Sequence, residues 1–201
     1  LLKDEEEAEP IILKEVEEKR EQDSKVFQMS DGTYMVAQYG FPIHYLDEKK
    51  SWVEYDNSVE LVSAEQNVQI LDDANELNLE AQARTDDSNG SKEYKNKKSN
   101  NDIRLANIAK HNNMVSVTKD NYKVTWGFIG AQKSKVEWIN KESTLTGNDK
   151  FLALPNITQE AYYPNVYTDV DIQYIISPLG VKENIILKNK NAQNKFKIQY
   201  N

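Results

Sequence analysis

The sequence predicts a mainly β protein: an antiparallel, sandwich-like domain with an N-terminal helix and a long polar loop. Three observations predict this class. Apolar and polar residues alternate through most of the chain after residue 24, as they do in half-buried strands. Turn signals such as Ser30-Asp31-Gly32 separate the alternating stretches. Strands and helices do not alternate along the chain, which disfavours a parallel sheet.

Composition and charge restrict the class of protein. The chain has 201 residues, of which 38% are apolar and 29% charged, enough for one large domain or two small ones. Its formal net charge is −8, and a nucleic-acid binder needs clustered positive charge. The absence of cysteine excludes disulfides and thiolate zinc sites. No apolar run is long enough to span a membrane as a helix. Neither nucleic-acid binding nor membrane insertion is therefore expected.

The first 24 residues form an acidic segment ahead of the predicted strands. Their composition, with Pro10 at a position where a helix can begin, predicts a helix over residues 10–23. A disordered leader over residues 1–24 is the alternative. The antiparallel β domain is expected to follow over residues 25–201.

A second polar segment covers residues 86–102 and contains Tyr94 as its only large apolar side chain. Its acids offset its lysines, so a solvated loop is expected in place of a basic binding patch. This loop divides the predicted domain into two possible sub-sheets, over residues 25–80 and 102–201. The clearest strand patterns occur at residues 34–39, 52–55, 103–108, 114–118, 122–128, 135–139 and 195–200.

Few residues suggest catalytic or metal chemistry. The two histidines, His44 and His111, lack the short spacing of a metal-binding pair, so a structural or surface role is expected. With seven glycines and no phosphate-loop or nucleotide-binding motif, no cofactor is expected. We assign no catalytic residue on this basis.

Carboxylates are the only candidate catalytic groups, and three occur in the hairpin from Tyr167 to Leu187. A glycosidase needs two carboxyl groups about 5–10 Å apart. Asp169 and Asp171 are two residues apart on one predicted strand, and Glu183 lies on the other. Whether Glu183 shares their face depends on the turn that joins the strands.

Two registers fit the turn. A two-residue turn at Pro178-Leu179 pairs Tyr174 with Glu183 and leaves both aspartates on the opposite face. A three-residue turn that includes Gly180 shifts the pairing by one residue. The first register gives the cleaner apolar face, whereas the Pro and Gly positions favour the second. In the first register, Glu183 is an inward-facing structural carboxylate, for which the Tyr174 hydroxyl or a lysine or arginine of the facing sheet is the expected partner.

Aromatic residues raise a second hypothesis, because sugar-binding sandwiches stack exposed rings on their ligands. Trp52, Tyr162 and Tyr163 are the candidate ligand-binding residues. The alternative is that the aromatic side chains belong to the hydrophobic core, which is the stronger expectation for Trp126 because its strand alternates cleanly.

Several motifs occur in a fixed order: DGTY at Asp31–Tyr34, PIHYLD at Pro42–Asp47, WVEYDN at Trp52–Asn57, and later YKVTWGF, YPNVYTDVDIQYIISPLGVKENIIL and FKIQY. They resemble a region near the start of large secreted proteins of Gram-positive bacteria, namely wall-associated, RHS-repeat and DNRLRE-domain proteins. The resemblance covers about residues 15–201 apart from the polar loop.

This resemblance implies a secreted or cell-surface protein, in which the region is a non-enzymatic structural or interaction module ahead of repeats. The implied partners are cell-wall glycan or other parts of the same polypeptide. A carbohydrate-binding module is the first alternative, and a glycosidase that uses Asp169, Asp171 or Glu183 is the second.

Overall fold

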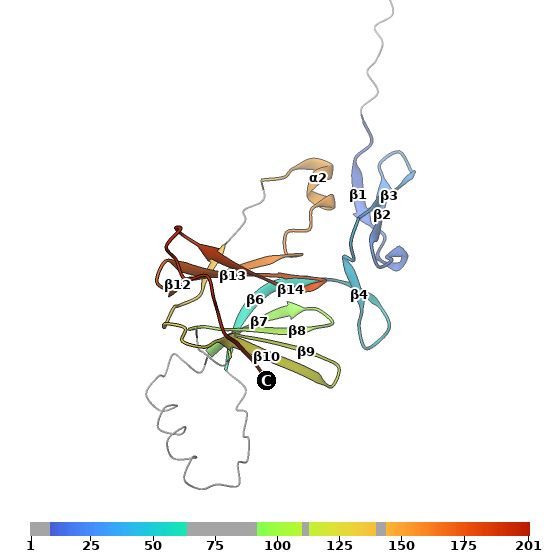
Figure 1. Cartoon of the computed structure of the whole chain (residues 1–201). Helices are drawn as coiled ribbons and strands as arrows, with labels where there is room; N and C mark the ends of the chain where they lie inside the picture. The colour runs from blue at the N-terminus through green and yellow to red at the C-terminus, as the bar shows by residue number, and fades with distance from the viewer. Residues whose placement is uncertain (1–8, 64–91, 110–112, 140–143) are drawn as a thin grey trace, which may run out of the picture. The chain divides into compact units, whose positions relative to one another are not determined.

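The computed structural model describes residues 9–63, 92–109, 113–139 and 144–201, and it confirms a mainly β fold with antiparallel strands (Figure 1). The chain divides into two compact units. Unit 1 contains residues 1–55 and 141–157, and unit 2 contains residues 56–140 and 158–201. This division differs from the expected one, because the boundary near residue 55 lies within the domain expected over residues 25–201.

Unit 1 contains a three-stranded sheet in the order β1-β2-β3 and a two-stranded sheet, β4-β5. Its elements are β1 (Ile12–Glu15), the 3-10 helix η1 (Glu17–Lys19), β2 (Ser24–Met29), β3 (Tyr34–Gln38), β4 (His44–Leu46), β5 (Trp52–Glu54) and α2 (Gly147–Leu152). Ile12, Phe27 and Met29 form the buried core, and Leu152 packs against them.

The predicted helix over residues 10–23 is wrong, because residues 12–15 form an edge strand. Ile12 pairs with Met29, and Val16 donates a backbone hydrogen bond to Val26 at 2.8 Å. As a strand, the segment buries Ile12 and Val16 and completes backbone pairing along β2. An acidic helix with one narrow apolar stripe would gain little of either, because most helical stability in proteins comes from packing an apolar face.

Unit 2 is a sandwich of a six-stranded and a four-stranded antiparallel sheet. The larger sheet has the order β15-β10-β9-β8-β7-β6, and the smaller has the order β11-β12-β13-β14. Their bounds are β6 (Asp56–Ser63), β7 (Lys92–Lys98), β8 (Asp102–Ala106), β9 (Val115–Lys119), β10 (Tyr122–Phe128), β11 (Glu137–Ile139), β12 (Gln159–Tyr167), β13 (Val170–Ser177), β14 (Gly180–Leu187) and β15 (Ile198–Tyr200). Figure 1 shows β12 and β13, in orange and red, stacked on β7 to β10, in green and yellow.

The sandwich core is formed by alternate residues of both sheets. Leu105, Val115 and Phe128 point inward from the larger sheet, and Ile172 and Tyr174 point inward from the smaller one. All five side chains are fully buried. The alternation at residues 103–108, 114–118 and 122–128 therefore correctly predicts strands β8, β9 and β10.

The loop expected over residues 86–102 is wrong for its second half, because residues 92–98 form β7; residues 86–91 lie outside the described residues. Although charged, β7 satisfies its polar groups within the sheet. Lys95 forms an ion pair with Asp102 at 2.9 Å. The buried Asn96 side chain accepts a hydrogen bond from the Ile103 amide at 2.9 Å and donates to Asn57 at 3.1 Å. These contacts replace the alternating apolar pattern on which strand prediction depends.

The hairpin of β13 and β14 adopts the first of the two predicted registers. Tyr174 pairs with Glu183, and Ser177 pairs with Gly180 across the two-residue turn. Gly180 has a φ of +121°, which a residue with a side chain adopts only under strain. The buried aliphatic face of β13 thus determines the pairing, as expected where one face of a sheet is buried.

Candidate functional site

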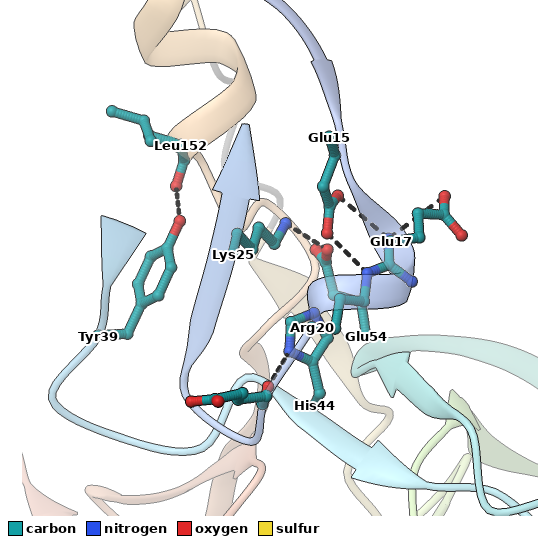
Figure 2. Close-up of polar contacts among 9 residues, drawn as sticks. Glu15, Glu17, Arg20, Lys25, Tyr39, His44, Glu54 and Leu152 are labelled. Carbon is teal, nitrogen blue, oxygen red and sulfur yellow. Dashed lines mark hydrogen bonds and ion pairs between the residues drawn. The ribbon is translucent and has the colours of Figure 1, made fainter. Parts of the chain in front are cut away.

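Unit 1 contains a compact cluster of charged side chains (Figure 2). Arg20 donates two hydrogen bonds to the Glu15 carboxylate, from Nε at 2.6 Å and from a terminal nitrogen at 3.1 Å. The side chain of Lys25 is only 4% exposed and forms an ion pair with Glu54. Arg20 also forms an ion pair with Glu17 at 3.4 Å, so the two cations contact three carboxylates. Although burial alone would raise it, the guanidinium of Arg20 lowers the pKa of Glu15 below its usual value.

His44 lies beside this cluster and is 1% exposed. Its Nδ1 lies 2.6 Å from the backbone carbonyl oxygen of Glu21, so Nδ1 carries the proton and donates it. Its Nε2 is buried without a hydrogen-bond partner. Burial lowers the pKa of His44, against the opposing effect of the Glu21 carbonyl. His44 is therefore a neutral structural histidine. His111 lies outside the described residues.

Asp171 is a well-satisfied carboxylate of unit 2. It is 2% exposed and accepts hydrogen bonds from the Asn165 amide at 2.6 Å, from Lys188 at 2.7 Å and from the Tyr162 hydroxyl. Asn165 lies in an irregular segment of β12 and has a φ of +52°. Although burial alone would raise it, these donors lower the pKa of Asp171, and the hydrogen bond to Asp171 raises the pKa of Tyr162 to about 12. Asp171 thus stabilises the irregular backbone of β12.

The three candidate catalytic carboxylates do not converge. Asp169 lies in the β12–β13 turn with a φ of +58°, so the expectation that it shares a strand face with Asp171 is wrong. Glu183 is opposite Tyr174, whereas Asp171 pairs with Ile186. Because successive residues of a strand project to opposite faces, Asp171 and Glu183 lie on opposite faces of the four-stranded sheet.

Glu183 is half-buried on the inner face of β14, where the indole Nε1 of Trp126 donates a hydrogen bond to its carboxylate at 2.9 Å. The donor comes from the facing sheet, as expected, but it is a neutral indole in place of a phenol or a cation. The Tyr174 hydroxyl is buried near this carboxylate and has no partner at hydrogen-bond geometry. Burial, followed by the charge of Glu183, raises the pKa of Tyr174 well above its usual value.

The three residues expected to bind a ligand do not form one platform. Tyr163 is fully buried in the sandwich core, and its hydroxyl donates to the backbone carbonyl of Ala106, so the expectation of an exposed ring is wrong. Tyr162 projects to the opposite face of β12, where its hydroxyl is bound to Asp171. Trp52 is half-buried in β5 and belongs to unit 1.

Two other rings are exposed that the sequence pattern does not single out as ligand-binding residues. Tyr122 and Tyr200 are 81% and 66% exposed, and both lie on the face of the six-stranded sheet that carries Trp126. Val124, between Tyr122 and Trp126 on this face, is also exposed. The alternation of β10 indicates that these residues share a face. It does not indicate that only part of this face is covered by the smaller sheet.

Two buried tyrosines give opposite expectations for the same substitution. Tyr163 and Tyr174 pack edge to face at 5.9 Å, but only the Tyr163 hydroxyl is hydrogen-bonded. We expect Tyr163→Phe to lower the free energy of unfolding by about 1 kcal/mol, because a buried carbonyl loses its partner. Tyr174→Phe should leave the free energy of unfolding unchanged or raise it, because the substitution removes a buried hydroxyl that has no hydrogen-bond partner. Denaturant unfolding measures both, and a larger loss for Tyr174→Phe would contradict the assignment.

In the described ranges, no three histidine, aspartate or glutamate side chains are close enough to hold a metal ion, and no helix is long and apolar enough to cross a membrane. Comparison with protein-family models, with curated proteins and with solved structures finds no match. The functional argument therefore depends on the geometry of the side chains.

Proposed function

We propose that the chain is a non-enzymatic structural or interaction module of a larger secreted or cell-surface bacterial protein. The observation that supports this role best is the separation of Asp171 and Glu183 on opposite faces of one sheet. A hydrolase of the two-carboxylate type needs both groups on one side of its substrate. Asp171 is also fully engaged by three donors, which suits a structural role better than proton transfer.

The secreted or cell-wall location and the partners come from the sequence resemblance. Its motifs include the DGTY turn and the YPNVYTDVDIQY hairpin. The proposed partners are cell-wall glycan and other parts of the same polypeptide. In unit 2, the Tyr163 hydroxyl and the Trp126 indole N–H each form a hydrogen bond from one sheet to the other. A scaffold whose two sheets are joined in this way suits a module that presents or shields neighbouring segments.

Carbohydrate binding is the second candidate, and the exposed rings of Tyr122 and Tyr200 favour it. Exposed aromatic side chains on one face are common at binding surfaces. The site would then lie on β10 and β15, and not at Trp52, Tyr162 or Tyr163.

Co-sedimentation tests the interaction role. We expect the chain to pellet with purified walls of Gram-positive bacteria, or to bind a separately produced downstream segment of its own polypeptide. A double variant, Tyr122→Ser with Val124→Ser, removes exposed apolar side chains, and Lys49→Ser in unit 1 is a surface control. Failure of the wild-type chain to bind either partner would overturn the proposal.

A further inference from the structure

Glu183 differs from the other buried or half-buried carboxylates described above in lacking a cationic partner. Glu15, Glu54 and Asp171 each form an ion pair with a lysine or arginine. Glu183 forms none with a described residue, and its hydrogen bond comes from the neutral indole of Trp126. A carboxylate withdrawn from water is costly unless a positive charge or several donors compensate it. The charge of Glu183 is thus compensated only in part.

Two tyrosine rings lie next to Trp126, whose indole donates to this carboxylate. The Trp126 ring lies 6.5 Å from that of Tyr174 and 6.4 Å from that of Tyr200, measured between centroids. Tyr174 is fully buried and cannot touch a ligand, whereas Tyr200 is open to solvent. Ring faces attract cations within about 6 Å, and an adjacent carboxylate adds a full negative charge. We call Glu183, Trp126 and Tyr200 the Glu183 site.

We propose that the Glu183 site binds an organic cation, either the arginine or lysine side chain of a partner segment or a small alkylammonium group. Charge complementarity supports this ligand class, because the Glu183 carboxylate forms no ion pair with a described residue. An anionic ligand is disfavoured by the same charge. This inference rests on the proposed interaction role and names the chemistry by which the module would recognise its partner.

A neutral sugar is the competing ligand, and the charge of Glu183 separates the two. A sugar hydroxyl can still donate to the neutral glutamine oxygen, although that hydrogen bond is weaker than one to a carboxylate. A cation loses its counter-charge when the carboxylate becomes an amide. Glu183→Gln also leaves an acceptor for the Trp126 indole, so the fold should be retained.

The test titrates the full chain with tetramethylammonium chloride, with N-acetyl-arginine methylamide and with N-acetylglucosamine, against sodium chloride at matched ionic strength. Tryptophan fluorescence is followed in a Trp52→Phe background, where the remaining tryptophans, Trp126 and Trp138, both belong to unit 2. Glu60→Gln is the matched control, because Glu60 is an exposed carboxylate of the same unit.

We expect at least one of the two cations to bind, with affinity about tenfold lower in Glu183→Gln and unchanged in Glu60→Gln. Tyr200→Ala should also weaken binding. Binding of only one cation identifies the source, a partner's side chain or a free alkylammonium compound. If neither cation binds, or if a cation binds equally well to wild type and Glu183→Gln, the inference is overturned. If only the sugar binds, the site is a carbohydrate site and the inference is also overturned. If co-sedimentation persists while both cations fail, the interaction role remains and only the Glu183 site is wrong.

Discussion

Asp171→Asn should lower the free energy of unfolding of unit 2 by about 2–3 kcal/mol. The substitution keeps the size of the side chain but removes the charge that accepts hydrogen bonds from Asn165, Lys188 and Tyr162. Hydrogen bonds to charged groups contribute about 1.5–3 kcal/mol each. Because the Lys188 side chain is 35% exposed and can regain water, we expect less than the 3–5 kcal/mol of a fully buried pair.

Urea unfolding in a Trp52→Phe background measures this effect on unit 2. Asp120→Asn is the matched control, since Asp120 is exposed in a turn with a φ of +53°, which asparagine tolerates. Because the folded pKa of Asp171 is lowered, its contribution is complete above the unfolded value near 3.9 and is lost as the pH falls below it. The difference between wild type and Asp171→Asn should therefore shrink in acid. Equal stabilities at neutral pH would contradict a structural role for this carboxylate.

Unit 1 should lose stability as the pH falls below about 6.5, the usual pKa of histidine in an unfolded chain. The pKa of His44 is lowered in the folded state. As the pH falls, the unfolded state therefore binds the proton at a higher pH than the folded state does, and this binding stabilises the unfolded state. Protonation in the folded state would place an N–H on Nε2, which has no buried acceptor. One proton limits the slope to about 1.4 kcal/mol per pH unit.

The charges around His44 determine the direction of this effect. Burial is the largest cause of the lowered pKa, and Arg20 and Lys25 oppose protonation further. Glu54 and the Glu21 carbonyl favour protonation without reversing the shift. The His44 ring and its contact with Glu21 are drawn in Figure 2.

His44→Asn tests the histidine directly. The asparagine amide can occupy the position of Nδ1 and donate to the Glu21 carbonyl, but it does not titrate. Unfolding is followed through Trp52 in a chain whose other tryptophans are phenylalanine. We expect the wild-type slope between pH 7 and pH 5 to disappear in His44→Asn, whatever the change in absolute stability. A slope that survives the substitution would assign the acid sensitivity to another group.

The sequence predicts much of the fold, because alternation is a local signal. The aliphatic face of β13 correctly favours the register that pairs Tyr174 with Glu183, although the Pro and Gly positions of the turn favour the other register. The edge strand β1 and the charged strand β7 escape prediction for a common reason. Both depend on neighbours distant in the sequence, such as Met29 for Ile12 and Asn57 for Asn96.

The candidate site is harder to predict than the strands. The hairpin sequence identifies Glu183 as an inward-facing carboxylate only in one of its two possible registers, the one that the structure adopts. Its donor, Trp126, is 57 residues earlier in the chain and reaches it only because the two sheets pack face to face. The burial of Tyr163 and the exposure of Tyr200 likewise depend on where the smaller sheet ends over the larger one. No local pattern contains that information.

The most direct test of the central claim, that the module is not a two-carboxylate hydrolase, is the release of reducing ends from purified Gram-positive walls incubated with the chain. With Asp171 and Glu183 on opposite faces of the sheet, we expect no release above that of walls alone. Release by the wild-type chain that is lost in Glu183→Gln, a variant expected to fold normally, would contradict the claim and assign Glu183 to catalysis.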